Sequence, residues 1–291
     1  MEDEGKKIKL TNDYVFKKIF GQRGNEKITE GFIGSVIGKK VDIKTLSEDR
    51  TLEKDLKDDK MGILDVRASL ENGTVCDIEM QVLRYADIEK RIMFYWSKLY
   101  LEKIKEGNRY EKLNKVIIIL VTEYELDITK DIKKYHTKWE IREEENYKKV
   151  LTEVLEINII ELSKMRKMMK ENKMENKKDK LALWVKFILF PDEVEERELE
   201  ENEDIKKAKE EYDKLMEDPR ERQLAEWRQQ RIMDEHAIRK GGYLDGKEEG
   251  IEQGKTEEKT EVAKRLLKMN LPIEQIIEIT ELTEEEINKL R

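Results

Sequence analysis

The stretch ILDVRASLENGTVCDIEMQV, residues 63–82, decides the fold because it has the two-residue alternation of a β-hairpin. Polar side chains occupy the odd positions of both arms, and apolar side chains occupy the even positions. The even set is Leu64, Val66, Ala68 and Leu70 in the first arm and Cys76, Ile78, Met80 and Val82 in the second. Both arms are therefore expected to bury the even face and to leave the polar side chains together on the other.

The turn determines which residues of the two arms lie opposite each other. Opposed residues of an antiparallel pair share a face, so the apolar faces align only where the two residue numbers have an even sum. A two-residue Asn72-Gly73 turn gives an odd sum and is excluded. A three-residue loop, Glu71-Asn72-Gly73, closed by its glycine at positive φ, gives an even sum. This register places Asp65 directly across from Glu79, with Gln81 one step further along the same face.

Two interpretations of this polar face are open on the residues alone. Asp65 opposite Glu79 is a pair of like charges, which is destabilising, and a divalent cation between them removes that cost because Mg²⁺ takes carboxylate oxygens from proteins. Alternatively, the acids lie on a solvated face, where Arg67 neutralises Asp65 or Asp77. The spacing by itself favours the second, plainer interpretation.

The composition bounds the class of protein. Charged residues make up 43% of the 291 positions and hydrophobic residues 37%, which is too polar for one compact globule, so part of the chain is expected to be solvated helix. There is no apolar run of about 18 residues and the N-terminus is charged, so neither a membrane span nor a secretory signal is expected. The single cysteine excludes an intrachain disulfide and predicts a cytoplasmic protein.

Charge argues against a protein that coats nucleic acid indiscriminately, because the net charge is −8 and the pI is near 5.3. A local basic groove remains compatible with that balance, since binding depends on where the cations lie. Residues 164–180 carry eight basic and three acidic side chains. This segment is either a phosphate-binding surface or, as charge runs more often are, a solvated linker or helix face.

Hydrophobic periodicity predicts helices and strands in alternation. The continuous β-branched run VIIILVT, residues 116–122, is typical of a strand covered on both faces and is the expected centre of the sheet. Two helices are expected within 10–38, further helices over 85–106 and 181–190, and further strands over 135–142 and 155–162. His136 has no partner at metal-ligand spacing and is expected to be structural.

The composition changes at Pro191. Residues 192–204 hold nine acidic side chains and one arginine, and residues 205–240 read as a charged helical arm that Gly241-Gly242 is expected to break. Glycines then follow at 246, 250 and 254, and two or three short helices are expected over 256–291. We therefore expect a core over 1–191, a charged helical arm over 192–255 and a C-terminal helical hairpin over 256–291.

Several motifs in this order resemble one family. The motifs are Asp65, the IEMQ run ending at Gln81, the aromatic helix RIMFYWSKLY (91–100), which begins with Arg91, the opening NDYVFKKIFG (12–21) and the late glycine series. They resemble the PD-(D/E)XK nuclease family transposases, also called Rpn-type recombination-promoting nucleases. The resemblance spans nearly the whole chain. It implies an α/β fold, with a restriction-endonuclease-like mixed central sheet flanked by helices and followed by the charged arm.

The resemblance also implies an activity, that of a metal-dependent DNA endonuclease which hydrolyses phosphodiester bonds and promotes recombination. It makes Asp65, Glu79 and the backbone carbonyl of Met80 ligands of Mg²⁺, with Mn²⁺ as a substitute. Gln81 stands where the wider nuclease class has lysine, so it supplies a hydrogen bond and no charge. The candidates for contact with DNA phosphates are Arg67, Arg91, Tyr95 and Lys98, and a homodimer or higher homo-oligomer is implied.

Two alternatives remain. A degenerate member of the same fold, which binds DNA or a protein partner without cutting, also fits the acidic pI, Gln81 and the charged arm. A scaffold whose arm and tail carry the function is the third hypothesis. Asp13, near the start of the first helix, is a minor acidic ligand candidate, for which a favourable interaction with the helix dipole is the plainer explanation.

Overall fold

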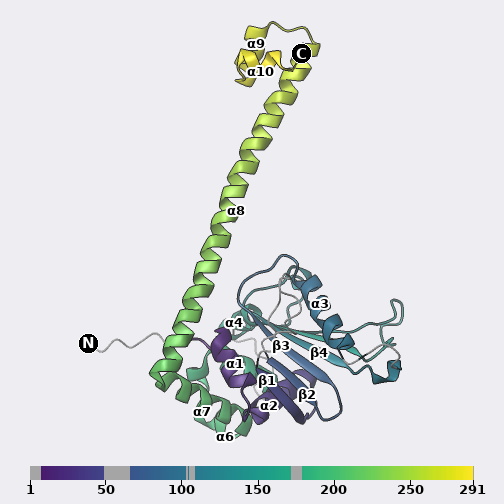
Figure 1. Ribbon diagram of the computed structural model, residues 1–291, viewed down its shortest axis with the longest axis vertical. Helices are drawn as coiled ribbons and strands as arrows, with labels where there is room; N and C mark the ends of the chain where they lie inside the picture. Colours follow the sequence, from purple (N-terminus) through teal and green to yellow (C-terminus); the bar gives the residue numbers. More distant parts are fainter. Residues whose placement is uncertain (1–7, 49–65, 103, 105–108, 172–178, 291) are drawn as a thin grey trace, which may run out of the picture. The chain divides into compact units, whose positions relative to one another are not determined.

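The computed structural model describes residues 8–48, 66–102, 104, 109–171 and 179–290 (Figure 1). By its internal contacts the chain forms two compact units, Met1–Gln229 and Gln230–Arg291. Each unit has its own apolar core, and we describe them separately.

The first unit is built on a mixed sheet that contains six strands within the described residues, in the order β1-β2-β3-β4-β6-β5. The first three strands pair antiparallel, β3, β4 and β6 run parallel, and β5 pairs antiparallel with β6. Their bounds are β1 Ile43–Glu48, β2 Val66–Leu70, β3 Val75–Gln81, β4 Val116–Thr122, β5 His136–Trp139 and β6 Leu155–Glu161. The expected mixed sheet is confirmed, and VIIILVT is its fully buried inner strand.

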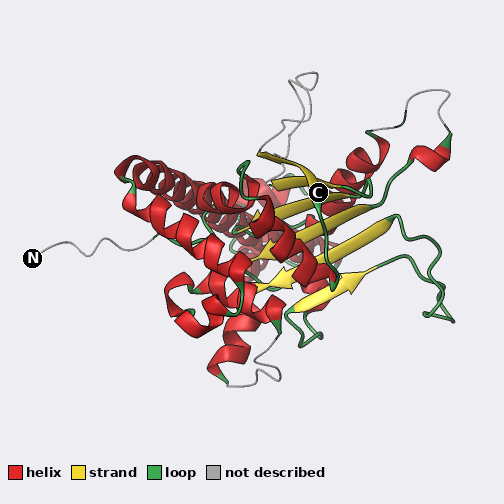
Figure 2. Cartoon of the chain, turned by 90° about the horizontal axis from the view of Figure 1, so that it is seen from below, coloured by secondary structure: helices red, strands yellow, loops and turns green. Residues whose placement is uncertain are grey.

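Helices cover both faces of this sheet, with most of the helices of the first unit to one side (Figure 2). One face packs against a large core contributed by α1 (Asp13–Gly21), α2 (Glu26–Ile37), α4 (Leu162–Lys170), α5 (Lys180–Leu189) and α7 (Glu203–Glu217). Phe16, Phe20, Phe32 and Trp184 form its fully buried aromatic centre. The other face is covered by α3 (Ile88–Leu101), whose buried residues are Ile88, Ile92, Tyr95 and Leu99.

The hairpin has the predicted register. Val66 lies opposite Ile78 and Arg67 lies opposite Asp77, so every described pair has an even sum. Gly73 has φ of 85°, and its N–H donates to the Leu70 carbonyl at 2.9 Å. Asp65, whose predicted position is opposite Glu79, lies outside the described residues, and that contact stays a prediction.

The acidic block after Pro191 does not stand apart from the core. It forms α6 (Glu196–Glu200) and the start of α7, and α7 buries Ile205, Ala208 and Tyr212 in the large core. Gly31 of α2 lies so close to Asp204 that a Cβ atom there would meet its carboxylate at 1.9 Å. This segment therefore packs against the core helices instead of forming a separate acidic arm.

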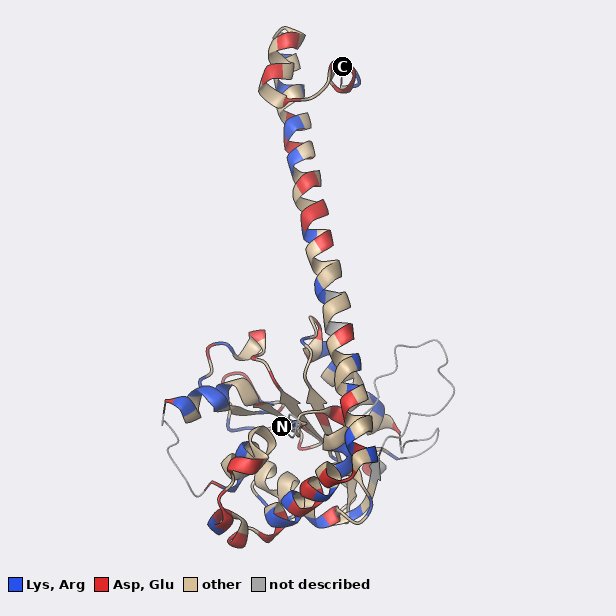
Figure 3. Ribbon diagram, turned by 90° about the vertical axis from the view of Figure 1, so that its left-hand side faces the viewer, with Lys and Arg blue, Asp and Glu red and all other residues tan. Residues whose placement is uncertain are grey.

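The expected break at Gly241-Gly242 is wrong, because α8 (Pro219–Lys268) is one helix of 50 residues. A glycine costs a helix interior about 1 kcal/mol relative to alanine, and the neighbouring glutamate, lysine, arginine and glutamine residues are good helix formers. Acidic and basic side chains alternate along α8, which supplies pairs one turn apart (Figure 3).

The second unit ends in two short helices, α9 (Ile273–Thr280) and α10 (Glu284–Asn288). Together with the end of α8 they bury Ala263, Ile276, Leu282 and Ile287. A capping box begins α10, where Thr283 and Glu286 exchange hydrogen bonds. In the described parts of the chain, no helix combines the length and apolar character needed to cross a membrane.

Candidate active site

The polar face of the hairpin lies under α3. Asp77 and Glu79 of β3 are 0% and 2% exposed, respectively, although carboxylates are seldom fully buried. The even residues of β3 enter the large core, so these odd residues point to the opposite face, which α3 covers. Two acids two positions apart on one strand therefore share a face and a dry environment.

Gln81 continues this face at the end of β3. Its Nε2 atom donates to Oε2 of Glu79 over 3.4 Å, and its side chain is half-buried. Met80, between them, sends its side chain into the large core. The strand thus brings together Glu79 and Gln81 of the predicted site.

Arg67 links the hairpin to α3. Its guanidinium makes two contacts with the carboxylate of Glu102, at the C-terminal end of α3, one of them 3.0 Å between Nη1 and Oε1. Its side chain is only 11% exposed, and the register places it opposite Asp77. The sequence predicts Arg67 either as a phosphate contact or as the cation that neutralises Asp65 or Asp77. It does not predict the pairing with Glu102, because no local pattern links two residues that lie 35 positions apart.

One stripe of α3 runs above these acids. Arg91, Tyr95, Lys98 and Glu102 recur at the helical spacing of three and four residues, so they share one side of the helix. Burial raises the pKa of Tyr95 to about 12, with Arg91 opposing the shift and Glu79 and Asp77 adding to it. The stripe therefore faces the buried carboxylates of β3.

Arg91 is held between two aromatic rings. Its guanidinium carbon lies 4.8 Å from the ring centre of Tyr85 and 5.1 Å from that of Tyr95. Its Nε atom is buried and makes no hydrogen bond within the described part of the chain. Lys98 lies over Phe94, with Nζ 4.3 Å from the ring centre. The structure thus groups Arg91, Tyr95 and Lys98 on the side of α3 that borders Glu79.

A second buried polar group lies on β6. Oδ1 of Asn158 is 3.0 Å from Nε2 of His136, and its Nδ2 donates to Glu156, which pairs with Lys115 at 2.6 Å. Burial lowers the pKa of His136, although the hydrogen bond with Asn158 opposes this. His136 thus takes part in a hydrogen-bonded network between β5 and β6.

At the end of β6, Glu161 and Lys164 form a buried ion pair with 2.6 Å between Oε2 and Nζ. Glu161 also accepts from the backbone N–H of Leu126 and from the hydroxyl of Thr129, while Lys164 donates to the Thr129 carbonyl. Lys164 is the first cation of the basic segment that begins there, and it is 5% exposed. This lysine therefore fixes a loop to the sheet, and residues 172–178 of the segment lie outside the described residues.

Asp13, the minor ligand candidate, has another neighbour. Its Oδ2 accepts from Nε of Arg228, at the start of α8, over 2.6 Å, and its Oδ1 accepts from the backbone N–H of Tyr14. The Asn12 side chain caps α1 and also donates to the Ala225 carbonyl. These contacts join α1 to the first turns of α8.

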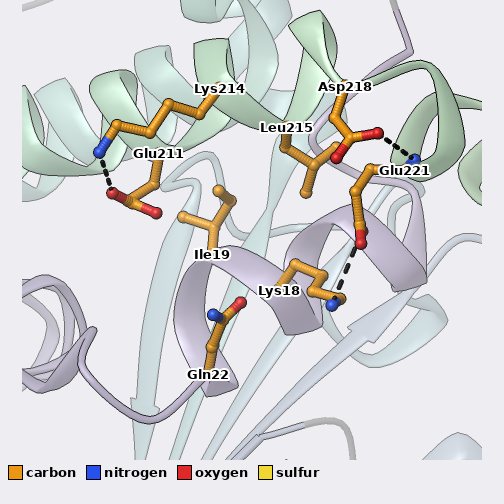
Figure 4. Close-up of a pocket in the computed structure, with 8 residues that line it drawn as sticks. All are labelled: Lys18, Ile19, Gln22, Glu211, Lys214, Leu215, Asp218 and Glu221. Atoms are coloured by element: carbon orange, nitrogen blue, oxygen red, sulfur yellow. Dashed lines mark hydrogen bonds and ion pairs between the residues drawn. The ribbon is translucent and has the colours of Figure 1, made fainter.

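A pocket of about 210 Å³ lies between α1, α7 and the start of α8 (Figure 4). Four of its charged side chains are paired with one another, Lys214 with Glu211 at 2.7 Å and Lys18 with Glu221 at 3.6 Å, and Asp218 accepts from the backbone N–H of Glu221. Ile19 and Leu215 supply its apolar wall. No residue of β3 lines it, so it is separate from the carboxylate site.

Glu79 offers carboxylate oxygens, which suit a hard divalent cation rather than a soft one. The described residues contain no group of three or more histidine, cysteine, aspartate or glutamate side chains that could hold a metal ion. Asp65, the predicted second ligand, lies outside them. The donor type at Glu79 fits a divalent cation, and completion of the site depends on Asp65.

Comparison with known proteins places the chain in one family. A family model described as PD-(D/E)XK nuclease family transposase matches residues 10–241. The comparisons with curated proteins and with solved structures gave no match. The chain therefore belongs to the PD-(D/E)XK nuclease family transposases, and its mixed sheet flanked by helices is the expected restriction-endonuclease-like fold.

Proposed function

We propose that this family member is a metal-dependent DNA endonuclease that hydrolyses phosphodiester bonds. DNA is the substrate that a nuclease family implies, and its members generally use divalent metal ions. The observation that carries the proposal is the buried carboxylate of Glu79, fixed on a central strand beside Gln81 at 3.4 Å. A fold maintained only for packing would gain stability from an apolar side chain at this position.

In this proposal Asp65, Glu79 and the backbone carbonyl of Met80 hold Mg²⁺, with Mn²⁺ as a substitute. When bound, the metal would polarise the scissile phosphate and lower the pKa of a water molecule. Glu79 pairs with Leu120 of the buried strand β4, so its backbone is held by the interior of the sheet. Such fixation lowers the reorganisation required when charge develops in the transition state.

Gln81 takes the place of the lysine of the wider class. Its amide donates and accepts hydrogen bonds and supplies no charge. We propose that it orients the attacking water, and that the positive charge comes from the α3 stripe. Arg91 and Lys98 are the phosphate contacts, while Arg67, bound to Glu102, holds α3 over the site. The hydroxyl of Tyr95 is protonated at neutral pH and can donate a hydrogen bond, and burial raises its pKa further, to about 12.

The test is nicking of supercoiled plasmid in Mg²⁺ or Mn²⁺, with and without a chelator, by the full chain and by Asp65→Asn and Glu79→Gln. Each amide keeps the size of the acid and removes its charge. We expect a loss of at least about 100-fold in both variants, because metal charge stabilisation is worth several kcal/mol. Glu71→Gln, an exposed change in the same hairpin, is the matched control and keeps full activity.

Circular dichroism of each variant separates loss of chemistry from loss of fold. Nicking that persists in folded Glu79→Gln would remove Glu79 from the mechanism. Absence of nicking by the native chain with any metal would favour the alternative, a member of the fold that binds DNA or protein without cutting.

A homodimer, a role in recombination and a cytoplasmic location are further parts of this proposal. Cutting both strands of a duplex commonly needs two sites, which supports the dimer. The single cysteine supports a reducing compartment. Sedimentation of the native chain tests the dimer, and a monomer at all concentrations would exclude it.

A further inference from the structure

Cations and aromatic rings are concentrated around the candidate active site. The described residues hold six contacts between a cation and a ring, and four of them lie within residues 84–124. Such contacts occur about once per 70–80 residues in proteins. These four contacts lie on α3, which carries the α3 stripe, and on the segments that follow β3 and β4.

Phe94, one of the rings in these contacts, is not packed in the core. Tyr95 is 4% exposed and packs under α3, whereas its neighbour Phe94 is 46% exposed. Phe94 lies on the same flank of the helix as Arg91 and Lys98, three residues after the first and four before the second. The flank therefore presents an exposed ring between two cations that are about 10 Å apart along the helix axis.

The side chains on this flank indicate which kind of ligand could bind there. Two cations with a ring between them suit a chain of phosphates that carries planar bases, because arginine and lysine bind phosphate and rings stack on bases. A base within a duplex has both faces covered by its neighbours. An unpaired base can offer a face to Phe94 anywhere along its strand, whereas a duplex exposes a base face only at its two ends.

We propose that the Arg91, Phe94 and Lys98 flank of α3 binds an unpaired segment of DNA strand beside the cleavage site, with a base stacked on Phe94. The substrate class is therefore DNA with a single-stranded or distorted segment, rather than continuous duplex. This inference rests on the proposed function only in taking DNA as the substrate. Stacking of one base on an aromatic side chain is worth about 1–3 kcal/mol.

The test is binding by fluorescence anisotropy, in chelator so that no cleavage occurs, of a labelled single strand, the matching duplex and a duplex with a single-stranded overhang. The full chain is compared with Phe94→Ala, Phe94→Trp and Met93→Ala. Met93 is the matched control, since it adjoins Phe94 on the helix and is 44% exposed but has no ring. Its truncation is expected to leave all three affinities unchanged.

We expect Phe94→Ala to weaken binding of the single strand and the overhang by about 5-fold to 150-fold and to change duplex binding by less than about 2-fold. Phe94→Trp keeps the preference for unpaired DNA. Equal losses for single strand and duplex, no loss, or no binding of any DNA by the native chain would overturn the inference. A similar loss in Met93→Ala would do the same and would indicate an apolar contact with a protein partner.

The plasmid nicking assay tests the nuclease and the binding assay tests the stacking site, so either proposal can fail without the other. A native chain that prefers single strands through Phe94 but never nicks DNA would retain this binding site and refute the nuclease. A chain that nicks plasmid, with Glu79 required, while Phe94→Ala binds all three DNAs as the native chain does, would retain the nuclease and refute the stacking site.

Discussion

Two strands of one sheet each bury two carboxylates, and they arrange them in opposite ways. On β6, Glu156 and Glu161 point to opposite faces, and each has a lysine at 2.6 Å. On β3, Asp77 and Glu79 share one face, about 7 Å apart along the strand. Ion pairs distributed in this way serve stability, whereas like charges gathered on one face cost stability and are characteristic of functional sites. The following predictions test that difference, from the largest change in stability to the smallest.

Lys164→Met is expected to have the largest effect. It leaves the carboxylate of Glu161 buried and without its cation, which costs about 3–5 kcal/mol of the free energy of unfolding. Urea denaturation measures the loss. Lys167→Met, three residues along the same helix, removes an ion pair with Glu125 from a lysine that is 67% exposed, and such surface pairs contribute at most about 1 kcal/mol. Similar losses in both variants would contradict a structural role for the buried pair.

Acidification is expected to weaken the network on β6 through His136. Burial lowers the pKa of His136 below its ordinary value of 6.5, so the unfolded chain takes up a proton at a higher pH than the folded chain. Stability is therefore present above the unfolded pKa and falls as the pH drops toward the folded pKa, by up to about 1.4 kcal/mol per pH unit.

The measurement compares urea midpoints at about pH 7.5 and about pH 5.5 for the native chain and for His136→Gln. Carboxylates that titrate at lower pH contribute to both proteins and cancel in the difference. An equal decline in the two proteins would show that His136 does not sense the change.

Glu79→Gln, measured for stability rather than activity, is expected to have the smallest effect. The amide removes a charge that shares a face with Asp77, so the free energy of unfolding is expected to stay within about 1 kcal/mol of the native value or to rise. The same denaturation experiment on Glu161→Gln gives the contrast, because it leaves Lys164 unpaired in the interior. A large loss at Glu79 would make β3 resemble β6 and would weaken the case for a functional carboxylate.

Local patterns in the sequence predicted the hairpin register and the central strand. Alternation over β2 and β3 fixes which side chains share a face, and the β-branched run of β4 reports burial on both faces. The face that carries Asp77 and Glu79 was expected to be polar, but its burial under α3 was not foreseen. Burial by another element depends on contacts that are distant in the sequence, as the pairing of Arg67 with Glu102 illustrates.

The features that the sequence did not predict correctly have different physical causes. Glu161 and Lys164 lie three residues apart across the start of α4, a spacing that sequence reasoning could have used had the basic segment not been treated as a single surface. Gly241-Gly242 was expected to end a helix because glycine is a poor helix former, yet the favourable residues on either side carry α8 through it.

The position of β3 in the sheet separates the motions of the site's two halves. β3 is hydrogen bonded to β2 on one side and to β4 on the other, so its amide protons are expected to exchange with solvent only when the whole unit unfolds. α3 is joined to the sheet by one buried side and by the contact of Arg67 with Glu102, and a helix held in this way opens in a smaller step. Opening of the site is therefore expected to move α3 while the carboxylates of β3 keep their places.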